Sequence, residues 1–225
     1  MQSLLFLPVA LLINVLVCTV SYSQTDSKLP NDTRWVRESL EYKALCEQTY
    51  QSAWRNISKS FINNPQAVIV MDLDETVLDN SLYQLELFEK SETYTPDSWN
   101  SWVNKEQAGL VPGAKEFILN FKNKTKCSIV YISDRDAKTL KATFNNLKQL
   151  GVLFDDDIIL LRKDNNDSKD IRREEVMRGT GRMKKYGPKM IMAYFGDQMG
   201  DFPKNDSFKF SVNKFIFPNP MYGKW

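Results

Sequence analysis

The sequence AVIVMDLDET, residues 67–76, decides the expected fold. Its first half, Ala67 to Met71, is a continuous apolar run without alternation, which is typical of a strand buried on both faces of a sheet. Two carboxylates separated by one residue, Asp72 and Asp74, follow at once. Because side chains two positions apart in an extended chain project to the same side, we expect both carboxylates at one edge of a central strand.

Similar apolar runs recur downstream and alternate with segments of helical spacing. Further strands are predicted at 128–132, 158–161, 191–195 and near 215–217, and helices near 113–123, 137–150 and 169–178. Residues 35–62 are predicted to form one long or two shorter amphipathic helices. Strands that alternate with helices predict an α/β fold with a doubly wound parallel sheet.

Residues 79–110 interrupt this alternation directly after the first strand. They are rich in Trp, Tyr, Asn and Ser. We interpret them as a small helical cap inserted over the carboxyl edge of the sheet, where open α/β folds bind their ligands. The cap would belong to a single domain that spans residues 24–225.

Polar side chains follow each of the later strands as well. Ser133 follows the second strand, Ser168 and Lys169 follow the third, and Asp197 and Asp201 follow the fourth. Since the carboxyl ends of parallel strands meet at one edge, we expect these groups to gather around the two carboxylates of the first strand. Such a set suits a phosphate ester together with Mg²⁺, which prefers oxygen ligands.

The amino-acid composition limits the catalytic mechanisms that this protein could use. The 225 residues include no histidine, which excludes Ser-His-Asp and Cys-His hydrolysis, histidine phosphatases, and zinc sites of the HExxH or Cys/His kind. Catalysis must therefore use carboxylates, lysine, hydroxyls or an oxygen-bound metal ion. A net charge of +2 gives no reason to expect a nucleic-acid polymer as a partner.

In these motifs and their order the chain resembles the haloacid dehalogenase superfamily of phosphohydrolases. More narrowly, it is similar to the secreted acid phosphatases and 5′-nucleotidases related to bacterial outer-membrane lipoprotein e. The resemblance covers nearly all of the chain after residue 23 and includes LDNS at 78–81, Trp99, Trp102, PGA at 112–114 and PNPMYG at 218–223. It implies a Rossmann-like core and a Mg²⁺-dependent phosphomonoesterase for small phosphate esters, among them nucleoside monophosphates.

The resemblance also implies a role for each candidate residue. Asp72 is the expected nucleophile, which would form an aspartyl-phosphate. Asp74 is the expected general acid, which would protonate the leaving alcohol and then activate water. Ser133 and Lys169 are expected to bind the phosphoryl oxygens. The expected Mg²⁺ ligands are Asp72, the backbone carbonyl of Asp74, and Asp197, with Asp201 bound through water or supporting the others.

Aromatic residues suggest how a nucleobase would be held. Tyr83 and Tyr222 are predicted to stack against the base, because relatives stack it between aromatic side chains of these regions. For Trp99 and Trp102 we favour a place in the core of the cap over contact with a base.

Two charged regions receive no catalytic role. Asp134 stands where relatives often carry Asn, which adds negative charge near an anionic substrate, and the next residue, Arg135, is expected to compensate this charge. The basic run from Arg172 to Lys189 is interpreted as a solvated helix face and loop.

Two other functions stay open. A phosphotransferase would pass the phosphoryl group from the same site to an alcohol instead of water. A non-catalytic secreted storage or binding protein is the alternative of a different class. Such relatives often lose the nucleophile, whereas Asp72, Asp74, Lys169 and Asp197 are all present here.

The first segment is expected to direct export. No charged residue precedes Asp26, and the apolar stretch from Leu4 to Val20 is shorter than the roughly 20 residues of a membrane span. We interpret residues 1–23 as a signal peptide and expect a secreted protein, periplasmic or outer-membrane associated in a bacterium. A single-span anchor and membrane attachment through a lipid on Cys18 stay open.

Two cysteines remain after such a cleavage. Cys46 and Cys127 could form a disulfide in an oxidising compartment. The apolar run that begins at Cys127 favours a buried thiol instead. A homodimer is among the oligomeric states that the sequence leaves open.

Overall fold

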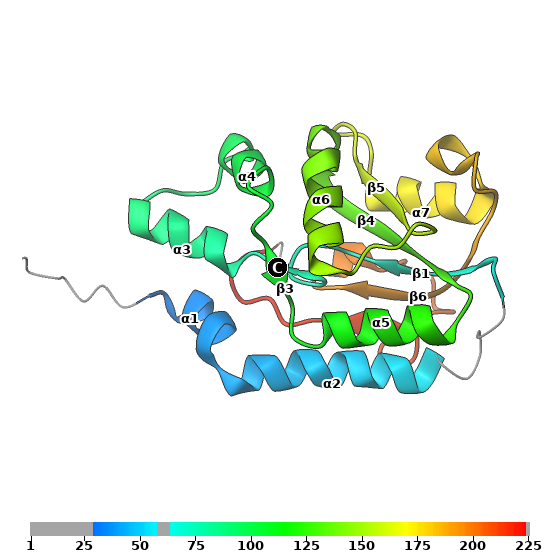
Figure 1. Cartoon of the computed structure of the whole chain (residues 1–225), viewed down its shortest axis with the longest axis horizontal. Coiled ribbons are helices and arrows are strands. Elements are labelled where there is room, and N and C mark those ends of the chain that lie inside the picture. The colour runs from blue at the N-terminus through cyan, green and yellow to red at the C-terminus, as the bar shows by residue number, and fades with distance from the viewer. Residues whose placement is uncertain (1–28, 58–63, 224–225) are drawn as a thin grey trace, which may run out of the picture.

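The computed structural model describes residues 29–57 and 64–223. Its core is a parallel five-stranded sheet with the strand order β5-β4-β1-β6-β7 (Figure 1). The strands are β1 (Ala67–Met71), β4 (Ser128–Asp136), β5 (Ile158–Arg162), β6 (Met190–Gly196) and β7 (Lys214–Ile216). Each predicted strand overlaps one of them, and the predicted fold class is confirmed. The predictions for residues 1–23, with Cys18, lie outside the described residues.

Helices cover both faces of the sheet. One layer contains α2 (Leu40–Ile57), α5 (Ala114–Lys124) and α6 (Leu140–Leu150), and the other contains α7 (Lys169–Arg178). In β1, Ile69 and Met71 pack into the first layer, while Val68 and Val70 pack into the second. Figure 1 shows α2 and α5 side by side beneath the sheet. Burial of β1 on both faces explains why its sequence does not alternate.

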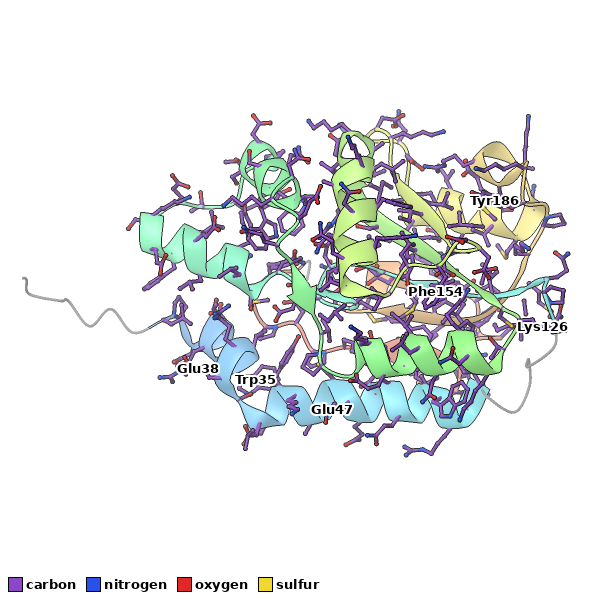
Figure 2. The ribbon with its side chains drawn as sticks, in the orientation of Figure 1. Trp35, Glu38, Glu47, Lys126, Phe154 and Tyr186 are labelled. Carbon is purple, nitrogen blue, oxygen red and sulfur yellow. The ribbon has the colours of Figure 1, made fainter. Side chains whose placement is uncertain are left out.

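The predicted amphipathic region 35–62 forms two helices, α1 (Asn31–Glu38) and α2. Between them Ser39 is extended, and its Oγ accepts a hydrogen bond from the Tyr42 backbone N at 3.0 Å. Ser39 therefore caps the start of α2. Trp35, labelled in Figure 2, packs edge-on against Tyr42 with ring centroids 5.5 Å apart. The end of the predicted region, residues 58–62, lies outside the described residues.

The segment predicted as a cap lies at one end of the sheet, beyond the carboxyl end of β1 (Figure 1). It contains α3 (Ser81–Lys90) and α4 (Pro96–Val103). A short antiparallel pair, β2 (Leu78–Asp79) and β3 (Gly109–Leu110), joins its two ends. The chain thus leaves and re-enters the core at nearly one point, directly beside the loop that follows β1.

Both described cysteines are buried, and they do not form a disulfide with each other. Burial raises the pKa of the Cys46 thiol to about 12. The Sγ of Cys127 donates to the Asn64 carbonyl at 3.4 Å. These environments agree with the interpretation of Cys127 as a buried thiol. Among residues 29–57 and 64–223, no helix is both long and apolar enough to cross a membrane.

Candidate active site

Four of the predicted side chains meet at the carboxyl edge of the sheet. One carboxylate oxygen from each of Asp72, Asp197 and Asp201 lies within 4.8 Å of the others. Asp72 follows β1 directly and is 5% exposed. The ammonium of Lys169, in the first turn of α7, donates to Asp72 Oδ1 at 2.5 Å and also to Asp201 Oδ1. Residues that are up to 129 positions apart in sequence therefore form one charged cluster, as the strand order requires.

This cluster has more negative than positive charge. Burial, with Asp201 and Asp197 adding to it, raises the pKa of Asp72 well above its ordinary value, although Lys169 opposes this shift. Burial and the nearby Asp201 raise the pKa of Asp197 to about 7. A divalent cation would relieve this repulsion, and Mg²⁺ prefers such oxygen ligands. The donor set therefore fits a metal ion held by Asp72 and Asp197.

Both carboxylate oxygens of Asp201 accept hydrogen bonds from other groups of the protein. Its Oδ2 accepts hydrogen bonds from the backbone N of Asp197 at 3.1 Å and of Gln198 at 2.9 Å, while Oδ1 binds Lys169. A 3₁₀ turn, Met199–Asp201, brings it back to the start of the loop. A Cβ on Gly196 would lie only 2.2 Å from the Cβ of Asp201. These contacts favour the supporting role among the two predicted for Asp201.

Asn219, for which the sequence pattern predicts no role, holds Asp197. Its Nδ2 donates to Asp197 Oδ2 at 2.8 Å, and its Oδ1 accepts from the Met221 backbone N at 3.0 Å. Tyr222, from the same segment, donates its hydroxyl to Glu75. The segment after β7 is therefore part of the site. The two prolines that flank Asn219 were the available signal for a rigid turn.

Asp74 lies beside this cluster, with its carboxylate surrounded by donors. Its Oδ1 accepts from Arg135 Nη2 at 2.7 Å, from Arg135 Nε at 2.9 Å and from Asn80 Nδ2 at 3.0 Å. Its Oδ2 accepts from the Ser133 hydroxyl at 3.1 Å. The predicted phosphate-binding hydroxyl is thus adjacent to the predicted acid. The sequence pattern assigned neither Arg135 nor Asn80 a role at Asp74.

The prediction of a solvated basic face is wrong for Arg172 and Arg173, which are both buried. Arg172 Nη1 donates to the Ser133 carbonyl at 2.5 Å, and Nη2 donates to Asp134. Burial alone would raise the pKa of Asp134, but Lys169 and Arg172 outweigh it and hold that pKa below its ordinary value. Arg172 therefore connects the end of β4 to the helix that carries Lys169. Arg172, and not the expected Arg135, compensates the charge of Asp134, because Arg135 pairs with Asp74.

The cap aromatics pack mainly against one another. Tyr83 is 2% exposed, with ring centroids 5.2 Å from Trp99 and 6.0 Å from Trp102, and its hydroxyl is hydrogen-bonded to Ser98. Because its ring is enclosed, Tyr83 offers no open face for the predicted stacking on a nucleobase. The favoured place of Trp102 in the cap core is confirmed by its burial. Tyr222 is partly exposed at the edge of the site.

A parallel sheet in this order, a cap after the first strand and an aspartate cluster with one lysine define a phosphohydrolase-type site of the haloacid dehalogenase class. The family model described as HAD superfamily, subfamily IIIB (acid phosphatase) matches residues 13–225. The chain belongs to this family.

Solved structures and a curated relative agree with this membership. The chain is similar to the class C acid phosphatase from Bacillus anthracis with tungstate bound, at 31% identity and a TM-score of 0.71, covering 85% of this chain and 84% of that one. A second structure of that enzyme gives 32% identity and a TM-score of 0.70 over the same shares. Vegetative storage protein 1 of Arabidopsis thaliana is 28% identical over 162 residues, which are 71% of this chain. The match spans 56% of that relative's length.

Proposed function

We propose that this protein is a Mg²⁺-dependent phosphomonoesterase that hydrolyses small phosphate esters through an aspartyl-phosphate on Asp72. The observation that carries the proposal is the assembly of Asp72, Asp197, Asp201 and Lys169 at the carboxyl edge of the sheet, with Asp74 beside them. Family membership supports the same reaction class.

In the first step, a carboxylate oxygen of Asp72 attacks the phosphorus atom. The bond from phosphorus to the ester oxygen breaks, and the proton of Asp74 goes to that oxygen, so that a neutral alcohol leaves. Lys169 stays charged near Asp72, because the two bound carboxylates outweigh burial and raise its pKa above the ordinary value. Its charge stabilises the added negative charge of the phosphoryl group.

In the second step, Asp74, now a carboxylate, takes a proton from water as that water attacks the phosphorus atom of the aspartyl-phosphate. The acyl-phosphate bond breaks, and Asp72 returns to its starting state with inorganic phosphate as the product. Mg²⁺ held by Asp72, Asp197 and the Asp74 carbonyl would neutralise charge on the phosphoryl oxygens. The tungstate in the similar solved structure is an oxyanion, which supports an oxyanion site here as well.

The match to a storage protein keeps the non-catalytic alternative in view. A non-catalytic storage protein would be expected to lack one or more of the catalytic side chains. Asp72, Asp74, Lys169 and Asp197 are all retained here, and their contacts are those that a reaction would use. We therefore favour catalysis.

For the substrate we propose nucleoside 5′-monophosphates or other small phosphate esters, with Tyr222 as the remaining candidate for a base contact. We further propose that residues 1–23 direct secretion, to the periplasm or outer membrane in a bacterium. The intact mass of the exported protein would separate a start near Gln24 from a lipid on Cys18.

A phosphate-release screen tests the function directly. Purified protein is assayed on nucleoside monophosphates, nicotinamide mononucleotide and sugar phosphates, in Mg²⁺ or in EDTA, with and without an added alcohol. We expect phosphate release in Mg²⁺ and its loss in EDTA. A phosphorylated alcohol as the main product would identify a phosphotransferase, and no turnover of any ester by the Mg²⁺-loaded protein would contradict catalysis.

A further inference from the structure

Asp74 is held mainly through one of its two carboxylate oxygens. Three of its hydrogen bonds converge on Oδ1: two from Arg135 at 2.7 and 2.9 Å and one from Asn80 at 3.0 Å. The other oxygen, Oδ2, receives the Ser133 hydroxyl at 3.1 Å and a longer contact of 3.3 Å from Arg135 Nε. The carboxylate is therefore anchored mainly through Oδ1, and Oδ2 accepts a hydrogen bond from the predicted phosphate-binding hydroxyl of Ser133.

Arg135 is itself fixed on several sides. It is only 1% exposed, so its guanidinium lies within the protein and not in the path of a substrate. Its Nη1 donates to Thr143 Oγ1 at 3.3 Å, and its Nη2 also donates to Asn80 Oδ1 at 3.3 Å. The guanidinium carbon lies 5.8 Å from the ring centroid of Trp99. A planar guanidinium held in this way can bind a carboxylate in one orientation, which a flexible lysine does not do.

Asn80 completes the arrangement and connects it to the cap. Its Oδ1 accepts from Trp102 Nε1 at 2.9 Å, and its Nδ2 donates to Glu75 Oε2 at 3.0 Å as well as to Asp74. Both tryptophans that touch this pair belong to the cap helix α4. The cap core is thus joined to the catalytic carboxylate through two buried side chains.

We propose that Arg135, with Asn80, is a positioning residue that fixes the carboxylate of Asp74 so that Oδ2 delivers the proton to the leaving alcohol. The inference rests on the proposed function, since it assigns Asp74 the role of general acid. It also gives the cap a role in catalysis, because Trp99 and Trp102 of the cap hold Arg135 and Asn80, which in turn hold Asp74.

The dependence of the rate on the leaving group tests this role. A poor leaving group such as the alkoxide of a nucleoside 5′-monophosphate needs the proton, whereas 4-nitrophenolate leaves without it. Arg135→Lys should lower kcat/KM for the nucleotide by roughly 10–100-fold, since misplacing a catalytic group by about 1 Å costs that much. For 4-nitrophenyl phosphate the loss should stay below about threefold, because general acid catalysis contributes little there.

Two further variants keep the test informative if Arg135→Lys does not fold. Thr143→Val removes the one hydrogen bond that the guanidinium donates to the Thr143 hydroxyl and should produce the same selective loss, about two- to tenfold on the nucleotide. Arg182→Lys is the matched control, because Arg182 pairs with Asp167 and Glu175 instead of Asp74. It should change kcat/KM for both substrates alike.

A double-mutant cycle separates positioning from general damage. In an Asp74→Asn background, Arg135→Lys should cost less than about twofold more on the nucleotide, since the two residues act as one unit. Equal losses on both substrates, or full additivity with Asp74→Asn, would overturn the inference and leave the phosphatase intact. A wild-type protein that hydrolyses neither ester would overturn the proposed function and this inference with it.

Discussion

Gly196→Ala should disable the site through a single added methyl group. The backbone conformation of Gly196 is one that other residues also adopt, so the expected effect of the substitution arises from steric overlap alone. The new Cβ would lie 2.2 Å from Asp201 Cβ and 2.4 Å from Asp201 Oδ2, whereas ordinary contact begins near 3.4 Å. Asp201 or the end of β6 must therefore move by roughly 1 Å, and a shift of that size at a catalytic centre can cost about 100-fold in rate. Forcing the packing should also cost about 1–3 kcal/mol of stability.

Gly200→Ala is the matched control, because it makes the same substitution in the same loop and its Cβ would meet nothing within 4 Å. Both variants are assayed for phosphate release over a range of Mg²⁺ concentrations, with thermal melting in parallel. We expect Gly196→Ala to lose about 100-fold in kcat/KM and to need more Mg²⁺, while Gly200→Ala stays within about twofold of wild type. Equal activity of Gly196→Ala and wild type would refute the placement of Asp201.

Three other perturbations follow from the same contacts. Asn219→Ala removes the 2.8 Å hydrogen bond to Asp197 and should weaken activity or Mg²⁺ affinity by about 10–100-fold, measured by Mg²⁺ titration; an unchanged affinity and rate would speak against the contact. Burial raises the pKa values of Asp72 and Asp197, that of Asp197 to about 7, so folding takes up protons and these two groups make the metal-free protein less stable as the pH rises from about 4 toward 7. The gain in Tm from Mg²⁺ over EDTA should accordingly be larger at pH 8 than at pH 5, and an equal gain would contradict metal binding by these carboxylates. Thr76→Val should be neutral or stabilising by about 1 kcal/mol in urea unfolding, because the buried Thr76 hydroxyl has no hydrogen-bond partner within the described part of the chain; a clear loss of stability would contradict this.

Local sequence was sufficient to predict the strands and their order in the chain. The run 67–71 lacks alternation because both faces of β1 are covered, and the same cause makes the other central strands recognisable. The parallel arrangement then places Asp72, Lys169 and Asp197 at one edge without any knowledge of side-chain contacts. The sequence did not decide whether the helical region breaks at Ser39, because a serine is compatible both with a continuous helix and with a cap between two helices.

The contacts that depend on long-range pairing were not predictable. Arg135 lies 61 residues from Asp74, and no local pattern distinguishes an arginine that is buried against a carboxylate from an exposed one. The same holds for Arg172, whose position in a charged run indicates solvent although its partners are the carbonyls and acids of neighbouring strand ends. An aromatic residue such as Tyr83 is equally compatible with a cap core and with a ligand face, and only the fold of the cap decides between them.

The central claim is that Asp72 carries the phosphoryl group. The most direct measurement is peptide mass spectrometry of the Mg²⁺-loaded enzyme, quenched in acid during turnover of a phosphate ester, with Asp72→Asn treated in parallel. The account predicts one phosphoryl group on the peptide that contains Asp72, its absence from Asp72→Asn, and no turnover by that variant. A phosphoryl group on another residue, or rapid phosphate release by Asp72→Asn, would contradict it.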